Sequence, residues 1–330
     1  YRLAYRLHAD VKIIGKMDGP FSRLGEYNAG ILAQGFFAAQ DKTIPESLKG
    51  STAEGGELAC PRPITTCSGC PHRGTYMAIN DAIRKLGYKK DEIMVTGDIG
   101  CTILGMNPPF HTLWTEVSMG ASIPIAQGYI QAGVTKPVVA TIGDSTFFHA
   151  GIPGLINAIQ QNVNLTVVIL DNGWTAMTGM QEHPATGFTL QGQPTNKLDF
   201  AALARVFGID NVRTVNPFDL KQVRKAMKEE LASDGPSVVI AQSPCVLFRR
   251  ANPAIGKPLR VDSEKCNGCR LCLGLGCSPI SWRPFSKMEE GTYRKKTKTQ
   301  DGIAVIESAY CTGCTLCRQL CKAGAIVEEE

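Results

Sequence analysis

Cysteine spacing is the feature of this chain that most directly indicates chemistry. Eight of its thirteen cysteines lie in two runs near the C-terminus. The first run has the spacing C-x2-C-x2-C-x4-C and consists of Cys266, Cys269, Cys272 and Cys277. The second has the spacing C-x2-C-x2-C-x3-C and consists of Cys311, Cys314, Cys317 and Cys321. Such triplets favour iron–sulfur ligation, because zinc sites prefer separated pairs, often with histidine, and no histidine follows His183.

Two runs of this kind are typical of two-cluster ferredoxins. A tight C-x2-C-x2-C loop reaches three corners of a [4Fe–4S] cube, and in those ferredoxins the other run supplies the fourth ligand. We therefore expect one cluster on Cys266, Cys269, Cys272 and Cys321. The second cluster is expected on Cys311, Cys314, Cys317 and Cys277. One departure is Lys322, which stands where proline usually follows the last cysteine.

Five cysteines remain outside the two runs: Cys60, Cys67, Cys70, Cys101 and Cys245. The pair Cys67-x2-Cys70 opens a predicted helix, whereas Cys101 and Cys245 each follow a predicted strand. Strand ends and helix starts of one sheet can meet in space, so four of these cysteines could hold a third [4Fe–4S] cluster and leave Cys60 spare. A redox-active C-x2-C pair with two buried cysteines is the alternative, and spacing leaves both open.

A second candidate site lies at the turn "GDSTFFHAGI". Gly143 permits a tight turn, Asp144 follows a predicted strand, and Asn172 ends the next strand 28 residues later. The helix after Asp144 turns its N-terminus toward any bound anion. Mg²⁺ prefers oxygen ligands shared with phosphates, and Asp144, Asn172 and the carbonyl of Trp174 could provide three. This is the Gly-Asp…Asn pattern of thiamine-diphosphate enzymes; no G-x4-GK-[ST] or strand-linked G-x-G-x-x-G motif offers a nucleotide alternative.

Predicted strands and helices alternate along the chain between these candidate residues. Short apolar strands are predicted at "EIMVTG", "VVATIG", "LTVVIL" and "SVVIAQ", with amphipathic helices at "GIPGLINAIQQ", "DFAALARVFG" and "DLKQVRKAMKEELA". Asp219 is expected to cap the last of these helices. In the first of them, Ile152, Leu155, Ile156 and Ile159 form one apolar face. This alternation predicts an α/β fold, a doubly wound parallel sheet with ligands at the carboxyl ends of its strands.

Three segments follow from the composition along the chain. Residues 1–57 are expected to be a linker or the tail of a preceding domain, with the polar tract 41–56 as linker. Residues 58–252 should form the sheet domain, and residues 253–330 a small α+β two-cluster ferredoxin domain whose folding depends on its metal. The basic tract 293–298 lies in a long insertion, expected to be a hairpin that is either a docking surface or a solvated loop.

Bulk properties exclude several classes of function. The net charge of +5 is too small to indicate nucleic-acid binding. No apolar run approaches the ~20 residues that span a membrane, and the start of the chain shows no signal segment. Cysteine triplets suited to metal rather than disulfides predict a reducing, cytoplasmic location. The chain begins at Tyr1 rather than methionine, so we expect that its N-terminus is missing or processed.

Five motifs in order resemble a known family: "CSGCPHRG", "GDIGC", "SMGASIPIAQG", "GDSTFFHAGI" and "ILDNGWTAMTGMQEHP". Over roughly residues 60–330 the chain is similar to the large subunit of indolepyruvate ferredoxin oxidoreductase, in the 2-oxoacid:ferredoxin oxidoreductase superfamily. The resemblance implies an anaerobic, thiamine-dependent oxidoreductase. A 2-oxoacid is decarboxylated with coenzyme A to an acyl-CoA, and electrons leave through [4Fe–4S] clusters to ferredoxin.

The resemblance also implies residue roles. Related enzymes hold a proximal cluster through a C-x2-C pair and two distant cysteines, places filled here by Cys67, Cys70, Cys101 and Cys245. Candidate catalytic residues are His72, His149 and Thr178. Candidate contacts to thiamine diphosphate and Mg²⁺ are Asp98, Gly100, Gly143, Asp144, Ser145, Asn172, Trp174 and Thr175.

A glutamate that activates the thiamine is absent from the pattern. In this superfamily it comes from a pyrimidine-binding domain, and this chain is expected to begin after it. The resemblance therefore implies a partner chain or missing N-terminal half, a smaller partner subunit and a homo- or hetero-oligomer. Two other functions stay open: a non-oxidative thiamine-dependent decarboxylase with structural clusters, and an electron-transfer subunit with a vestigial thiamine fold.

Overall fold

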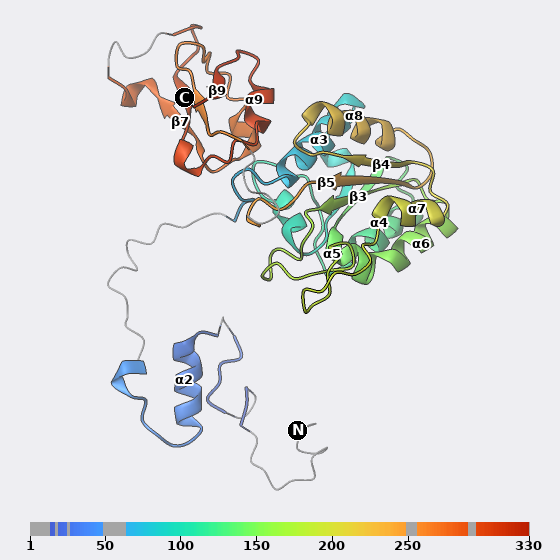
Figure 1. The fold of residues 1–330 in the computed structure, drawn as a ribbon, viewed down its shortest axis with the longest axis vertical. Coiled ribbons are helices and arrows are strands. Elements are labelled where there is room, and N and C mark those ends of the chain that lie inside the picture. Colours follow the sequence, from blue (N-terminus) through green and yellow to red (C-terminus); the bar gives the residue numbers. More distant parts are fainter. Residues whose placement is uncertain are drawn as a thin grey trace. The chain divides into compact units, whose positions relative to one another are not determined.

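The computed structural model describes residues 14–16, 19–24, 27–48, 64–248, 256–289 and 295–329. The chain divides into two compact units, Tyr1–Pro63 and Ile64–Glu330 (Figure 1). The first unit contains helix α2 (Ala29–Ala38), whose N-cap Asn28 accepts the Ile31 N–H through its side chain, and a 3-10 turn at Glu46–Leu48. That turn falls in the predicted linker 41–56, while the spare Cys60 lies outside the described residues.

The second unit is built on a five-stranded parallel sheet with strand order β1-β2-β3-β5-β4. The strands are β1 (Met94–Thr96), β2 (Val138–Gly143), β3 (Leu165–Asp171), β4 (Val212–Val215) and β5 (Ser237–Gln242). Four of them confirm the predicted strands. Edge strand β4 was not predicted, because Arg213 and Thr214 are exposed in its middle and interrupt any apolar run.

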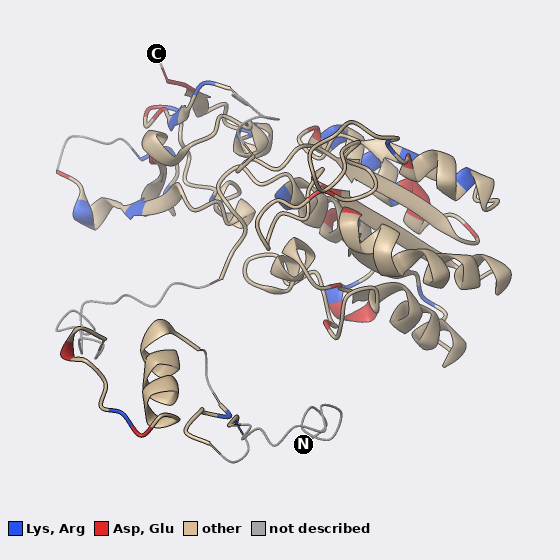
Figure 2. Ribbon diagram, turned by 60° about the horizontal axis from the view of Figure 1, so that its bottom comes forward, with Lys and Arg blue, Asp and Glu red and all other residues tan. Residues whose placement is uncertain are grey.

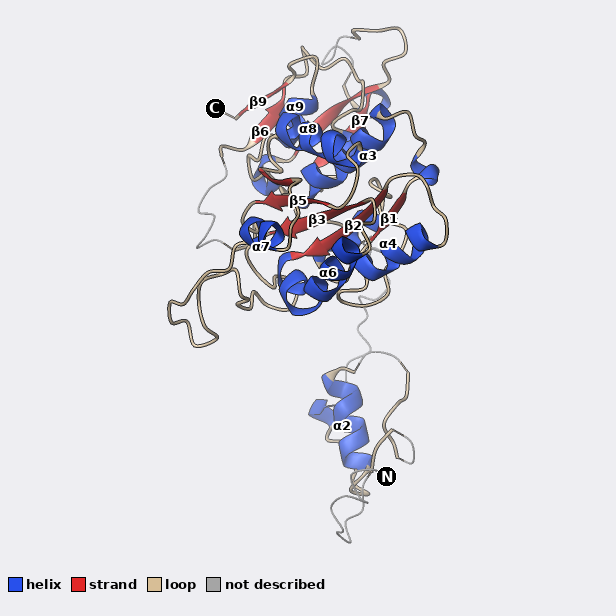
Figure 3. Ribbon diagram, turned by 90° about the vertical axis from the view of Figure 1, so that its right-hand side faces the viewer, coloured by secondary structure: helices blue, strands red, loops and turns tan. Residues whose placement is uncertain are grey.

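Helices cover both faces of the sheet (Figure 3). One face carries α3 (His72–Lys85) and α8 (Leu220–Leu231); the other carries α4 (Ser122–Gln131), α6 (Ile152–Gln160) and α7 (Phe200–Val206). Alternate strand residues serve the two layers: Val139 and Val168 pack into the α3/α8 core, whereas Val138 and Val167 pack into the other. This confirms the predicted doubly wound architecture.

Local signals for the helices were mostly correct. Asp219 caps α8, where its carboxylate accepts the N–H groups of Lys221 and Gln222, both at 3.0 Å. In α6 the predicted apolar face is wrong at Ile156, which is 45% exposed. The reason is that Leu155 and Ala158 form the buried side of this short helix, so its contact with the sheet is narrower than the sequence pattern suggested.

The cysteine-rich segment packs against the α3/α8 face of the sheet. Strands β6 (Leu259–Val261) and β9 (Ile326–Glu328) pair antiparallel, as do β7 (Ile280–Pro284) and β8 (Gly302–Ile306), and α9 (Leu316–Leu320) follows. Its Leu275 and Leu316 belong to the same buried core as Val223 of α8. The predicted boundary at 252/253 falls in 249–255, outside the described residues.

The insertion between the two cysteine runs forms a hairpin of β7 and β8, as expected. The described part of the basic tract, residues 295–298, is exposed beside its turn. Most charged residues of the second unit lie on helices and loops around the sheet (Figure 2), but Asp171 ends β3 and Arg213 lies in β4. Within the described residues, none of the helices combines the length and apolar character needed to cross a membrane.

Candidate functional site

A cavity of about 130 Å³ opens at the carboxyl ends of β2 and β3. Gly143 at the end of β2 pairs with Leu170 in β3, so the residues that follow each strand emerge side by side. The cavity is lined by ten predicted site residues: His72, Gly100, Cys101, Gly143, Asp144, Ser145, Asn172, Trp174, Thr175 and Thr178. Parallel sheets bind ligands at this edge, and here segments up to 106 positions apart in sequence meet.

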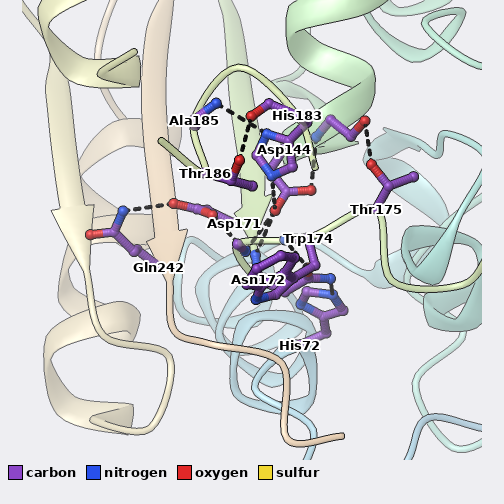
Figure 4. A network of polar contacts seen from close by, with 12 residues as sticks. His72, Asp144, Asp171, Asn172, Trp174, Thr175, His183, Ala185, Thr186 and Gln242 are labelled. Atoms are coloured by element: carbon purple, nitrogen blue, oxygen red, sulfur yellow. Dashed lines mark hydrogen bonds and ion pairs between the residues drawn. The ribbon is translucent and has the colours of Figure 1, made fainter. Parts of the chain in front are cut away.

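Asp144 is the most heavily bonded group in the cavity (Figure 4). Its carboxylate is buried, and Oδ1 accepts the Ser145 N–H at 2.8 Å. Oδ2 accepts the N–H groups of Asn172 at 3.0 Å and Gly173 at 2.8 Å. These bonds hold the carboxylate in one orientation against the turn that follows β3. A negative charge fixed in this way is suited to bind a cation.

His183 contacts Asp144 from a distant loop, and sequence reasoning missed it. Its Nε2 lies 3.3 Å from Asp144 Oδ2, and its side chain is fully buried. Nδ1 accepts the Ala185 N–H at 3.3 Å, which assigns the ring proton to Nε2, beside the carboxylate. The Nε2–H does not align as a hydrogen bond, so the contact is electrostatic. Because 39 residues separate His183 from Asp144, no local sequence pattern indicates this contact.

Asp171, the last residue of β3, is a second buried carboxyl group beside Asp144. Its Oδ1 accepts the Gly173 N–H at 3.0 Å, and its Oδ2 accepts from Gln242 Nε2 at 2.6 Å. Burial raises the pKa of Asp171, and the nearby Asp144 raises it further. Two carboxyl groups this close repel each other when ionised, and a bound cation would relieve that repulsion. The donor set therefore fits a hard metal ion.

Asn172 contacts both Asp144 and His72. Asn172 Oδ1 accepts the Trp174 N–H at 3.0 Å, and its Nδ2 lies 3.5 Å from His72 Nε2. His72 is buried at the start of α3, where burial lowers its pKa to about 4 although Asp144 acts in the opposite direction. His72 is therefore neutral near pH 7. Trp174 is held by its ring contact with Phe248, with centroids 3.9 Å apart.

The remaining wall of the cavity combines hydroxyl groups with open glycine backbone. Thr175 Oγ1 donates to Ser145 Oγ at 2.8 Å, while Thr178 Oγ1 donates to the Gln181 side chain at 2.5 Å. A Cβ built on Gly100 would meet nothing within 4 Å, and on Gly143 only a Thr102 methyl group at 3.9 Å. The space above these glycines fits a diphosphate that approaches the backbone closely.

Two predicted site residues are not brought to the cavity. Asp98 is fully buried, and its carboxylate accepts the N–H groups of Ile99, Gly120 and Ser122, which ties this loop to the start of α4. His149 is exposed on a π-helical turn, Phe147–Gly151, and is not among the lining residues. A basic groove of about 820 Å³ beside α8 contains none of the predicted site residues.

The two C-terminal cysteine runs meet in the crossed grouping that their spacing suggested. Burial raises the pKa of Cys272 to about 11, and the thiols of Cys266, Cys269 and Cys321 contribute. All four line one small cavity. For Cys314, burial likewise raises the pKa to about 11, with contributions from Cys277 and Cys311. Residues of both runs therefore surround each candidate cluster position.

The other four cysteines also lie near one another. Burial raises the pKa of Cys101 to about 11, and the neighbouring Cys245 and Cys67 raise it further. The pKa of Cys70 is likewise raised by burial and by the neighbouring Cys67 and Cys101. Cys101 also lines the Asp144 cavity. In the described residues no three His, Cys, Asp or Glu side chains have the spacing of ligands around one metal ion.

Comparisons with known proteins agree with this geometry. Residues 98–241 match the family "Thiamine pyrophosphate enzyme, C-terminal TPP binding domain". The chain is 37% identical to the indolepyruvate oxidoreductase subunit IorA of Methanothermobacter marburgensis over 97% of its own length and 48% of that relative. The IorA of Archaeoglobus fulgidus is 34% identical, with 96% and 48% covered. The chain thus spans about half the length of these relatives.

A solved structure supports the fold. The 2-oxoglutarate:ferredoxin oxidoreductase from Magnetococcus marinus, with 2-oxoglutarate, coenzyme A and succinyl-CoA bound, aligns with a TM-score of 0.52 and 24% identity over 61% of this chain and 74% of that chain. The 2-oxoglutarate synthase subunit KorB of Archaeoglobus fulgidus is 29% identical over 58% of this chain and 73% of that relative. The chain is therefore a relative of the indolepyruvate oxidoreductase IorA subunits, and its residues 98–241 match the thiamine-diphosphate-binding domain.

Proposed function

We propose that this chain is the thiamine-diphosphate-binding and electron-exporting part of an indolepyruvate-type 2-oxoacid:ferredoxin oxidoreductase. The reaction would convert a 2-oxoacid and coenzyme A to an acyl-CoA and CO₂, with two electrons passed to ferredoxin. The observation that carries the proposal is the cavity wall, in which the carboxylate of Asp144 and the thiol of Cys101 line the same space. A cofactor bound there would lie directly beside a route for electrons.

Different residues of this chain would bind the metal ion and the diphosphate. We assign Mg²⁺ to Asp144, Asn172 and the carbonyl of Trp174, and the diphosphate to Ser145, Thr175 and the open backbone at Gly100 and Gly143. His183 fixes Asp144, because its Nε2 lies 3.3 Å from that carboxylate. When bound, thiamine diphosphate supplies a carbon nucleophile for the 2-oxoacid carbonyl and accepts the electrons released with CO₂.

His72 has a separate role in this proposal. Because burial keeps its imidazole neutral, His72 can accept or donate a hydrogen bond at Nε2 without introducing a charge beside Asp144 and Asn172. Thr178 lies at the exposed rim of the cavity, where it could contact substrate. His149 would act only through another part of the enzyme, since it is exposed and does not line this cavity.

The electron path consists of three [4Fe–4S] clusters. We assign the proximal one to Cys67, Cys70, Cys101 and Cys245 and the other two to the crossed C-terminal groups. Sulfur atoms in both of these groups accept backbone hydrogen bonds: Cys311 Sγ from Leu259 N–H at 3.3 Å and Cys321 Sγ from Ala325 N–H at 3.2 Å. Such bonds are common at clusters and influence their reduction potentials.

The cavity supports the inference that other protein supplies the rest of the active site. At about 130 Å³ it is well below the ~300–1,000 Å³ of pockets that enclose a whole small-molecule ligand. We propose that a pyrimidine-binding domain, in a partner chain or in a longer form of this one, closes the site and contributes the activating glutamate. A smaller partner subunit, ferredoxin and an oligomeric cytoplasmic assembly complete the proposal.

An anaerobic assay of the complete oxidoreductase tests this function. Arylpyruvate, coenzyme A and an oxidised viologen dye should give acyl-CoA together with reduced dye. An aldehyde without dye reduction would instead indicate a non-oxidative decarboxylase, and no turnover with intact clusters would indicate an electron-transfer subunit. Iron analysis provides an independent check, since three clusters require about 12 iron atoms per chain and two require about 8.

A further inference from the structure

Arg73 is a buried cation in the first turn of α3. Its side chain is completely inaccessible to solvent. The guanidinium donates only to backbone carbonyls: Nε to Cys67 O at 3.0 Å, one terminal nitrogen to Leu275 O at 2.8 Å, and the other to Thr66 O. Among the described residues no carboxylate pairs with it. A buried charge with neutral partners alone is unfavourable, so a nearby anion is expected.

Cysteine side chains assigned to two different candidate clusters lie near the guanidinium. Burial lowers the pKa of Arg73, while Cys277, Cys70, Cys314 and Cys67 all act to raise it. Cys67 and Cys70 belong to the proximal group, and Cys277 and Cys314 belong to the second group. Arg73 therefore lies between the two positions, and iron–sulfur clusters held by four thiolates would bring net negative charge to both sides of it.

Packing of the ligand loops supports this location. Ser68, between Cys67 and Cys70, contacts Ser278 through hydroxyl oxygens 2.8 Å apart, and Ser278 directly follows Cys277. A Cβ built on Gly69 would lie 1.9 Å from Oγ1 of Thr312, a residue that lies between Cys311 and Cys314 in the sequence. The C-x2-C loop thus rests directly on both segments that supply the second cluster, with Arg73 bonded to its carbonyls. This contact makes the second cluster, rather than the one near Cys266, the neighbour of the proximal cluster.

We propose that Arg73 is a shared electrostatic positioning residue for these two clusters, a fixed positive charge that raises the reduction potential of both. This inference rests on the cluster assignments of the proposed function. In each transfer one electron leaves the proximal cluster, which is oxidised, and enters the second cluster, which is reduced; Arg73 keeps its proton throughout. Because the guanidinium stays near both clusters, it stabilises the added electron on either one and lessens the repulsion between them.

A structural clamp is the competing explanation, because Arg73 also joins the Thr66–Cys67 carbonyls to Leu275. Substitutions separate the two roles. Arg73→Lys keeps the charge but loses the planar fork that reaches several carbonyls. Arg73→Met removes both charge and hydrogen bonds, while Arg73→Gln removes the charge and keeps a smaller amide donor. The charge explanation predicts that Lys behaves like Arg; the clamp explanation predicts that Lys behaves like Met.

The test is an anaerobic redox titration of the cluster-loaded full chain, followed by electron paramagnetic resonance without substrate. In Arg73→Met or Arg73→Gln, the one-electron reduction equilibria of the proximal and second clusters should become at least tenfold less favourable, a 59 mV fall in potential. In Arg73→Lys both should stay within threefold of wild type. The cluster on Cys266, Cys269, Cys272 and Cys321 should change least and serves as the internal control.

Each other outcome has a definite meaning. Unchanged potentials in the neutral variants, or equal shifts in Lys and Met, would overturn the inference. If both neutral variants lose the two clusters while Arg73→Lys retains them at wild-type potentials, the charge is supported; if Arg73→Lys loses them too, the clamp explanation replaces it. Fewer than three clusters in the wild-type chain would instead contradict the proposed function, before any variant is compared.

Discussion

Replacing Asp144 by asparagine tests the metal and diphosphate site most directly. The carboxylate accepts N–H groups from Ser145, Asn172 and Gly173. In the Asp144→Asn variant one oxygen becomes an NH₂ group, so at least one of these backbone donors must face another donor. A hydrogen bond to a charged group contributes about 1.5–3 kcal/mol, and the free energy of unfolding without cofactor should fall by about that amount.

The larger effect should be on ligand-dependent stability. A ligand at 100 times its dissociation constant stabilises the folded state by about 2.7 kcal/mol. With about 2–4 °C per kcal/mol for a domain of this size, this corresponds to a rise of about 5–10 °C in melting temperature. Wild-type oxidoreductase should show this rise with Mg²⁺ and thiamine diphosphate and lose it with a chelator. Asp144→Asn should show almost none, because the variant lacks the anionic ligand.

Asp98→Asn is the matched control for this experiment. Asp98 is also a buried carboxylate that accepts three residues' backbone N–H groups, from Ile99, Gly120 and Ser122, yet it does not line the cavity. Its substitution should lower the melting temperature without cofactor by a similar amount and leave the cofactor-dependent rise intact. Thermal denaturation under anaerobic conditions measures both quantities. An undiminished rise in Asp144→Asn would refute the assignment of Asp144 as a metal ligand.

Three further predictions concern other parts of the chain. Cys321→Ser should remove the cluster of the first run and leave the other C-terminal cluster, whereas Cys277→Ser should do the reverse; each variant should lose about 4 iron atoms. If each substitution instead removed the cluster of its own run, the crossed assignment would be contradicted. Asp219→Ala should reduce the free energy of unfolding by about 1 kcal/mol, measured by thermal denaturation, because two backbone N–H groups lose their acceptor; an unchanged value would show that water replaces the cap fully. Gly120→Ala should destabilise by more than about 2 kcal/mol, since its Cβ would lie 2.5 Å from another side chain. The control Gly133→Ala has a similar positive φ but open space, so it should lose only about 1 kcal/mol; equal losses would contradict the packing explanation.

Much of the sheet could be predicted because its signals are local. The apolar strands β1, β2, β3 and β5 and the cap at Asp219 depend on residues within one element. β4 could not be predicted, since an edge strand with an exposed Arg213 has almost no pattern of its own. The burial of Ile156 was misjudged for a related reason: the width of a helix contact depends on the surface it meets, not on the helix alone.

The candidate site divides in the same way. Asp144 and Asn172 could be predicted because each directly follows a strand, and parallel strands place such residues at one edge. His183 could not, because Asp144 is 39 residues away in sequence; nor could the role of Arg73, because Leu275 and Cys277 lie about 200 residues from it. Asp98 was predicted as a cofactor contact from its neighbours in "GDIGC", yet its carboxylate turns inward to unpaired backbone N–H groups of the α4 start. Sequence shows that a carboxylate follows a strand; it does not show which donors surround it.

Residue types and their spacing indicate which chemistry this chain is equipped for. Ligand spacing within a loop of a few residues is a local property, so the two cysteine runs and the Gly-Asp-Ser turn could be interpreted without coordinates. The way in which these local sites come together depends on the fold. Sheet register brings Cys101 into the wall beside Asp144, and packing of the cysteine-rich segment on the α3/α8 face brings the Cys67–Cys70 loop against Ser278 and Thr312. The physical reason is that proximity between remote segments arises from the burial of shared apolar surface, which no short stretch of sequence encodes.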